Sequence, residues 1–176
     1  MTGLPALVGV DIAEVSRVAR AVADLGDSYT RHVMTPAERA AAGDDAVAVT
    51  ASVAMKECLI KAVGGRPAGF SWHDFDPVTG RRDDSARPVT RLLDEATGPV
   101  AQLLDEAAER LRAVTDLPLR HEVVHHVRGA SRRAALARLT SGDAATTPVV
   151  GVARWGCHGD AVIALALLVV DNREER

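Results

Sequence analysis

The stretch Ala51-Ser-Val-Ala-Met-Lys-Glu-Cys-Leu-Ile-Lys-Ala-Val-Gly-Gly65 decides how the chain folds. Apolar residues lie on almost every side of this segment, and its closing glycine pair is typical of a helix end. A helix that is apolar all round is normally buried, so the charges of Lys56, Glu57 and Lys61 need a partner or a cleft. Glu57 and Lys61 are four residues apart and share one face. Taken alone, they indicate a surface ion pair worth about 0.2–0.5 kcal/mol.

The composition limits the possible functions. The 176 residues suit a single domain over 1–176 with a substantial core, although only 3% are aromatic, so Ala, Val and Leu must build that core. A net charge of −3 excludes a general basic field for nucleic acid. The two cysteines, Cys58 and Cys157, offer no disulfide framework, and a cytoplasmic location is expected. No apolar run reaches membrane-spanning length, and residues 1–10 lack the basic start of a signal peptide.

The N-terminal half is predicted to combine one strand with several helices. Residues 7–12 are apolar enough for a buried strand. Asp11 would lie where this strand gives way to a helix over 14–25, a position that often carries binding residues. Thr35-Pro-Ala-Glu38 is a capping box with proline at the first helical position, which marks another helix start. The long central helix is predicted over 46–63.

The C-terminal half completes an α+β fold, in which an antiparallel sheet packs against the long central helix. Alternating residues favour strands over 70–76 and 119–127, the second with exposed histidines rather than a metal site. Two apolar runs, 149–155 and 161–170, predict a hairpin of buried strands. The other predicted elements are an edge strand at 88–93 and helices at 97–114 and 130–139, the last with its arginines in solvent.

Some polar positions have an ordinary structural interpretation. Glu14, Arg17 and Arg20 are typical of the solvated face of a helix. The glycines of the loop 64–69 could let a backbone approach a phosphate, but the loop lacks a phosphate-loop pattern. Taken alone, this loop is best interpreted as a turn.

Several motifs occur together in a specific order. Gly9-Val-Asp-Ile-Ala-Glu-Val-Ser-Arg17 comes first, Thr35-Pro-Ala-Glu38 follows, and Ala54-Met-Lys-Glu-Cys-Leu-Ile-Lys-Ala62 lies in the central helix. In order and spacing they resemble the motifs of the holo-acyl-carrier-protein synthases, the small bacterial 4′-phosphopantetheinyl transferases. Gly69-Phe-Ser-Trp-His-Asp-Phe-Asp76 is similar to the strand that follows in that family. The resemblance covers residues 7–76 well and the closing hairpin loosely.

The resemblance implies a reaction and its partners. The pantetheine phosphate of coenzyme A would be transferred to a serine of an apo acyl carrier protein or a related carrier domain, leaving adenosine 3′,5′-bisphosphate. The implied cofactor is Mg²⁺, which prefers carboxylate oxygens, phosphates and waters. Neither nucleic acid nor a membrane is an expected partner. In the short family members three subunits build the sites at their interfaces, so a homotrimer is expected.

The resemblance also assigns roles to individual residues. Asp11 and Glu57 match the metal-binding carboxylates, and Glu57 is also the candidate for assisting deprotonation of the carrier serine. Lys61 matches the lysine that contacts phosphate and protonates the leaving group. Arg17 matches the arginine that meets the acidic recognition helix of the carrier, and Arg20 follows it on the same helix.

Four further residues are assigned to coenzyme A contacts by the same resemblance, and their alignment is partly open. Lys56 and Gly64 belong to the signature helix and its end. The family usually closes with Ser-x-Ser-His, and either Cys157 or His158 takes the place of that histidine. The choice matters because a shift of one residue turns a strand over.

Two departures from the family pattern support an alternative function. Ser52 stands where the family usually has an arginine, four residues before the motif lysine, and the family histidine is displaced or replaced. The chain also carries atypical extra material within 77–148. The alternative is therefore a catalytically impaired member that acts as a carrier-protein-binding or scaffolding module, although the intact Asp11, Glu57 and Lys61 favour an enzyme.

Overall fold

The structure, a computed structural model, describes residues 5–78, 87–140 and 147–170, with the side chains of 87–98 left out. It contains a five-stranded sheet in the order β1-β5-β4-β3-β2, and every neighbouring pair is antiparallel. The strands are β1 (Ala6–Glu14), β2 (Phe75–Pro77), β3 (His121–Val127), β4 (Val149–His158) and β5 (Ala161–Val170). The predicted α+β class and closing hairpin are confirmed.

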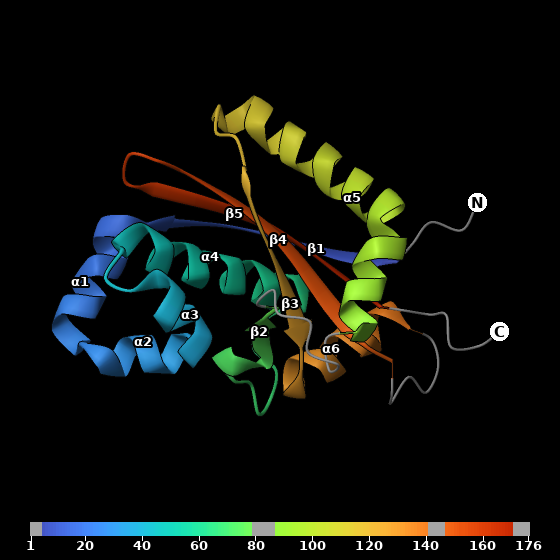
Figure 1. Cartoon of the computed structure of the whole chain (residues 1–176), viewed down its shortest axis with the longest axis horizontal. Coiled ribbons are helices and arrows are strands. Elements are labelled where there is room, and N and C mark those ends of the chain that lie inside the picture. Colours follow the sequence, from blue (N-terminus) through green and yellow to red (C-terminus); the bar gives the residue numbers. More distant parts are fainter. Residues whose placement is uncertain (1–4, 79–86, 141–146, 171–176) are drawn as a thin grey trace.

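Helices cover both faces of this sheet (Figure 1). One face packs against α4, which α1, α2 and α3 flank, and the other packs against α5. The helices are α1 (Val15–Leu25), α2 (Asp27–Val33), α3 (Pro36–Ala42), α4 (Ala46–Ala62), α5 (Arg87–Thr115) and α6 (Gly129–Leu139), with a 3₁₀ turn η1 (Trp72–Asp74). The long central helix predicted over 46–63 is therefore confirmed as α4.

Small residues bring α4 close to the sheet. A Cβ atom on Gly9 of β1 would lie 1.9 Å from the backbone oxygen of Cys58, so only glycine permits this approach. Ala153, Ala164 and Ala166 are buried on the same face of the sheet. This packing explains how a core with few aromatic side chains fills its volume, because alanines let the backbones of helix and strands approach each other.

Local capping signals fix the ends of the helices. At α3 the Thr35 hydroxyl accepts from the Glu38 amide, and the Glu38 carboxylate accepts from the Thr35 amide at 2.7 Å, which confirms the capping box. Asp45 caps α4. The N-terminus of α1 takes its cap from the β4–β5 turn, since the Asp160 carboxylate accepts from the Ser16 amide at 2.8 Å and from its hydroxyl at 2.6 Å.

Three predictions about secondary structure are wrong. Residues 88–93 belong to α5 rather than to an edge strand, since proline is tolerated in the first turn of a helix. In the 70–76 segment most residues form a loop and η1, and pairing begins only at Phe75. Asp11 lies within β1, which continues to Glu14, rather than at the strand-to-helix junction.

One prediction about exposure fails, and another holds only in part. His125 of β3 is fully buried, since β3 is an inner strand with both faces covered. On α6, Arg138 donates to the backbone oxygen of Ala62 at 2.6 Å, and Arg132 donates to that of Thr147 at 2.7 Å. Arg133 and Arg138 are exposed as predicted, but Arg132 is half-buried, and Arg132 and Arg138 also link chain segments.

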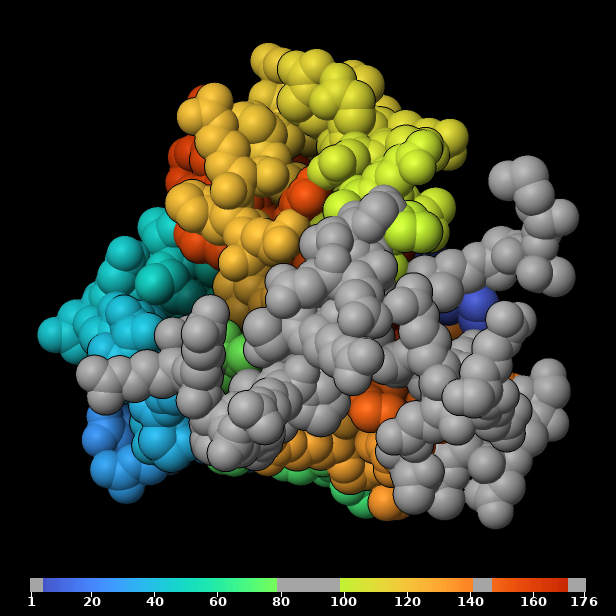
Figure 2. All heavy atoms as spheres, turned by 45° about the vertical axis from the view of Figure 1, so that its right-hand side comes forward, coloured from blue at the N-terminus to red at the C-terminus, as the bar shows by residue number. Residues whose placement is uncertain are grey.

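The outer face of the sheet is only partly covered. Val100 and Leu104 of α5 pack against the β4 and β5 residues of that face. Figure 2 shows the described part of α5 at the molecular surface, beside the gold atoms of β3. At the β1 edge of the same face, Val8 and Ile12 are 58% and 62% exposed. In the part of the chain that the structure describes, no helix combines the length and apolar character needed to cross a membrane.

Candidate active site

Asp11 of β1 and Lys61 of α4 form the centre of the candidate site. The Lys61 amine donates to an Asp11 carboxylate oxygen at 2.7 Å and to the backbone oxygen of Val10 at 3.1 Å. Odd-numbered β1 residues face α4, so the strand directs the Asp11 side chain toward the helix. The hydrogen bond to Asp11 raises the pKa of Lys61. The amine is therefore a protonated donor at neutral pH.

Glu57 lies one helical turn before Lys61, as the sequence predicts, but its partner is Arg66. The Arg66 guanidinium donates to Glu57 Oε1 at 2.9 Å. The sequence had suggested an ion pair between Glu57 and Lys61. This pair does not form, because Lys61 is paired with Asp11 instead. The two carboxylates of the expected metal site are each held by a separate basic side chain.

Electrostatic contacts show that these groups share one environment. The charges of Asp11 and Glu57 both raise the pKa of Lys61, and both raise the pKa of the buried thiol of Cys58, which follows Glu57 in sequence. Burial raises the pKa of that thiol, which excludes a thiolate at neutral pH. Burial also raises the pKa of Tyr29 on α2, with Arg17 acting in the opposite direction and Glu57 adding to the rise.

The donor set fits a hard divalent cation. Carboxylate oxygens such as those of Asp11 and Glu57 are the protein ligands that Mg²⁺ prefers, and both side chains keep some exposure to water. Within the described residues, no group of three His, Cys, Asp or Glu side chains converges. A cation held here would complete its coordination with water and phosphate oxygens, as Mg²⁺ commonly does.

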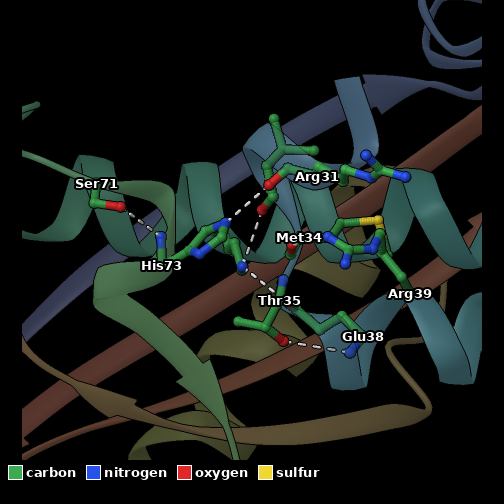
Figure 3. Close-up of polar contacts among 9 residues, drawn as sticks. Arg31, Met34, Thr35, Glu38, Arg39, Ser71 and His73 are labelled. Carbon is green, nitrogen blue, oxygen red and sulfur yellow. Dashed lines mark hydrogen bonds and ion pairs between the residues drawn. The ribbon is translucent and has the colours of Figure 1, made fainter. Parts of the chain in front are cut away.

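Lys56 lies elsewhere, although it precedes Glu57 directly. Its side chain is fully buried, and its amine donates to Glu38 Oε2 at 2.6 Å and to the backbone oxygen of Val33 at 3.0 Å. Figure 3 shows Thr35 and Glu38 at the N-terminal end of α3, with His73 directed at the backbone of Arg31. This burial contradicts the expected coenzyme A contact, because the enclosed amine cannot reach a ligand.

The glycine loop after α4 serves the helix end. The Gly64 amide donates to the backbone oxygen of Lys61 at 3.0 Å, and the Gly65 amide donates to that of Ile60 at 2.9 Å. Both glycines have positive φ, which other residues adopt only with strain. Because these amides are occupied, Gly64 does not offer its N–H to a phosphate, contrary to the coenzyme A contact expected of it. The loop instead turns Arg66 back toward Glu57.

The sheet register separates Cys157 from His158. Asp11 pairs with Ala164, which pairs with Trp155, while Cys157 lies two residues further along β4. Cys157 therefore shares the Asp11 face of the sheet, and His158 lies on the opposite face. Both are exposed and line a pocket of about 350 Å³ together with Asp116, Leu117, Pro118, Arg120, His121 and Gly156.

Arg17 and Arg20 lie on the exposed side of α1. Neither forms an ion pair with any carboxylate that the structure describes. Arg17 lies near the site, since its charge lowers the pKa of Tyr29, on which Glu57 also acts. The charge of Arg20 lowers the pKa of Asp160. Both guanidinium groups are available to an acidic partner.

Two residues near the site were not predicted from the sequence. Arg66 was interpreted as part of a turn, although its position between a glycine pair and two aromatic residues was a usable signal in a chain with so few aromatics. Tyr29 carried no such signal beyond being the single tyrosine of the chain. Its approach to Glu57 depends on how α2 packs beside α4.

Comparison with known sequences identifies the family. The profile of the 4′-phosphopantetheinyl transferase superfamily matches residues 7–116. The holo-[acyl-carrier-protein] synthase of Cereibacter sphaeroides is 35% identical over 127 residues, which cover 68% of this chain and 79% of that protein. The synthase of Koribacter versatilis is 40% identical over 72 residues, 39% of this chain and 58% of that protein. The match with Clavibacter michiganensis covers 60% of its synthase, so these last two relatives are matched over less than two thirds of their length.

Solved structures show the same fold. The Helicobacter pylori holo-[acyl-carrier-protein] synthase, in complex with coenzyme A, superposes with a TM-score of 0.55 at 12% identity, covering 94% of this chain and all of that one. The Neisseria meningitidis synthase gives a TM-score of 0.53 at 17% identity, with 92% and 96% covered. The matched profile spans the strand and the helix that bring Asp11, Glu57 and Lys61 together. With this fold and these motif residues in place, the chain belongs to the 4′-phosphopantetheinyl transferase superfamily.

Proposed function

We propose that the chain transfers the 4′-phosphopantetheine group of coenzyme A to a serine of an apo acyl carrier protein or a related carrier domain. The observation that carries this proposal is the Lys61–Asp11 contact of 2.7 Å beside Glu57, which joins two distant motifs. The family supports this reaction, as do the synthases to which the chain is similar. Asp11 and Glu57 would hold Mg²⁺, which when bound neutralises the diphosphate charge and polarises its oxygens.

The residues of the site have complementary roles in this proposal. Glu57 accepts the proton of the carrier serine hydroxyl, directly or through a water molecule. The serine oxygen then forms a bond to the phosphorus next to pantetheine, while the bond from that phosphorus to the bridging oxygen breaks. Lys61, which Asp11 keeps protonated in the free protein, contacts the diphosphate and gives a proton to the departing adenosine 3′,5′-bisphosphate.

The remaining site residues serve recognition. Arg17 and Arg20 would contact an acidic helix of the carrier, since both are exposed on α1 next to the site. Cys157 has the position at the end of β4 that faces the same side as Asp11, which favours it over His158 for a contact with the nucleotide. Substituting each arginine by glutamine would raise the KM for the carrier and leave the affinity for coenzyme A unchanged.

A transfer assay tests the proposal. The protein is incubated with coenzyme A, Mg²⁺ and several apo carriers, and mass spectrometry detects the added phosphopantetheine. We expect transfer with the natural chain and a loss of about 10²- to 10⁴-fold in Glu57→Gln, the range assigned to a general base. The matched control is Glu109→Gln, which changes an exposed glutamate of α5. Full activity of Glu57→Gln in a folded protein would remove Glu57 from the chemistry.

The second candidate is a carrier-binding module without transferase activity. The observation that favours it is that both candidate metal ligands are engaged in ion pairs, Asp11 with Lys61 and Glu57 with Arg66. Measurable carrier binding together with no transfer to any carrier would establish this alternative.

We also propose that the chain forms a homo-oligomer, with a trimer favoured. The exposed Val8, Val10 and Ile12 on the outer face of β1 support this proposal, because apolar side chains on an edge strand are typical of contact surfaces. Val8 and Val10 border a hollow of about 620 Å³ between β1, β5 and α5. Light scattering coupled to size-exclusion chromatography would give the mass, and a monomer at all concentrations would contradict the proposal.

A further inference from the structure

Arg66 forms an ion pair with Glu57, which is a candidate metal ligand. Its guanidinium donates to Glu57 Oε1 at 2.9 Å, while 53% of its side chain is exposed. The contact is thus formed at the open side of the site, where solvent and ligands have access. A cation that takes Glu57 as a ligand must displace Arg66 or share the carboxylate with it.

Two aromatic rings hold the Arg66 side chain in place independently of Glu57. The guanidinium carbon lies 4.9 Å from the centroid of Trp72 and 5.5 Å from that of Phe70. The rings are arranged edge to face, 6.0 Å apart. Cation–π contacts of this kind are attractive even at exposed sites. These contacts keep the guanidinium beside the site even when Glu57 is engaged elsewhere.

The charges around the site are balanced in pairs. Lys61 neutralises Asp11 and Arg66 neutralises Glu57. A divalent cation bound to both carboxylates would leave two basic side chains without their partners. A diphosphate supplies the missing negative charge, so the binding of cation and diphosphate must favour each other through these side chains.

We propose that Arg66 exchanges partners during the reaction: it neutralises Glu57 in the free protein and binds the diphosphate of coenzyme A when the cation takes Glu57. This inference rests on the proposed function, and it adds a residue that the motifs do not contain. The guanidinium presents five donors in a planar fork suited to phosphate oxygens, and one of its nitrogens donates to Glu57 here. Its position above the two rings allows the fork to turn toward a phosphate without leaving the site.

The test compares Arg66→Met with Arg66→Lys, and it does not depend on turnover. Mn²⁺ serves as the probe for the cation, and calorimetry measures its Kd in the absence of coenzyme A. A second titration measures the Kd of coenzyme A at saturating Mn²⁺. The matched control is Arg112→Met, since Arg112 also forms an exposed pair with a glutamate, Glu109, but lies on α5. Circular dichroism verifies the fold of each variant.

The expected results have opposite signs for the two ligands. Arg66→Met should bind Mn²⁺ roughly fivefold or more tightly, because a positive charge next to Glu57 is gone. It should bind coenzyme A roughly tenfold or more weakly, because a charge-assisted hydrogen bond is lost. Arg66→Lys should keep the natural Mn²⁺ affinity and recover only part of the coenzyme A affinity, since it lacks the planar fork. Arg112→Met should change neither.

Other results would overturn the inference. An unchanged Mn²⁺ affinity in Arg66→Met removes the competition for Glu57, and an unchanged coenzyme A affinity removes the contact with the diphosphate. A natural chain that binds neither ligand overturns the inference together with the proposed function. A chain that shows both affinity changes but transfers to no carrier overturns the proposed function alone.

Discussion

Two lysines of α4, five positions apart, have opposite environments. Lys56 is fully enclosed and pairs with Glu38, whose side chain is 5% exposed, whereas Lys61 is 53% exposed and pairs with Asp11. Burial lowers the pKa of Lys56, while the hydrogen bond to Asp11 raises that of Lys61. Both contacts are short, at 2.6 Å and 2.7 Å, so contact distance does not distinguish them.

The difference teaches that burial, and not the motif, sets the role of each lysine. The Lys56 pair ties α4 to the end of α2 and the start of α3, because the amine also donates to Val33 and the Glu38 carboxylate also caps Thr35. The Lys61 pair joins α4 to β1 at an edge open to ligands. The Lys56 pair is therefore structural, and the Lys61 pair is accessible to ligands. Variants at the two lysines should separate effects on stability from effects on activity.

The largest effect on stability is expected for Lys56→Met. It leaves the Glu38 carboxylate buried without its cation, and breaking a buried ion pair typically lowers the free energy of unfolding by about 3–5 kcal/mol. Urea unfolding followed by circular dichroism measures the change. The double variant Lys56→Met with Glu38→Gln should recover part of the loss. A single variant within about 1 kcal/mol of the natural chain would mean that the two lysines are equivalent.

Acid should lower the free energy of unfolding through His125, the buried histidine of β3. Burial, assisted by the charge of Lys56, lowers the pKa of His125 from 6.5 to about 3. Between these two values the unfolded chain binds a proton that the native protein does not, so the free energy of unfolding falls as the pH is lowered from about 6.5 to about 3. The slope from this residue is at most about 1.4 kcal/mol per pH unit.

Unfolding curves measured at a series of pH values test this prediction. His125→Leu removes the titrating group and should flatten the profile between pH values of about 4 and 6 relative to the natural chain. The difference between the two chains isolates this residue from the carboxylates that titrate in the same range. Parallel profiles would show that His125 is protonated in the native protein.

The smallest effect on stability is expected for Lys61→Met. Exposed ion pairs contribute about 0–1 kcal/mol, so the free energy of unfolding should change by no more than that. Transfer of phosphopantetheine, measured by mass spectrometry, should nevertheless fall by roughly 10²-fold or more, because the proposed donor to the diphosphate is lost. A large loss of stability with retained transfer would reverse the roles that the structure assigns to Lys56 and Lys61.

The local signals in the sequence were sufficient for most of the fold. The capping box at Thr35, the apolar run of α4 and the hairpin around Gly159 each depend on neighbours in sequence, and the structure confirms all three. The segment 88–93 was mistaken for a strand because a short apolar run with a proline fits an edge strand as well as a first helical turn. His125 was placed in solvent because the pattern did not show that the α4 side of the inner strand β3 is covered.

The sequence by itself predicted which residues would carry the proposed chemistry, since Asp11, Glu57 and Lys61 occur in motifs whose order and spacing it displays. Only the tertiary structure decided their partners: it enclosed Lys56, brought Arg66 to Glu57, and put Cys157 rather than His158 on the Asp11 face. The physical reason is that helix and strand formation depend on short-range preferences along the chain. Burial and ion pairing instead depend on which surfaces meet, and a single sequence does not specify those contacts.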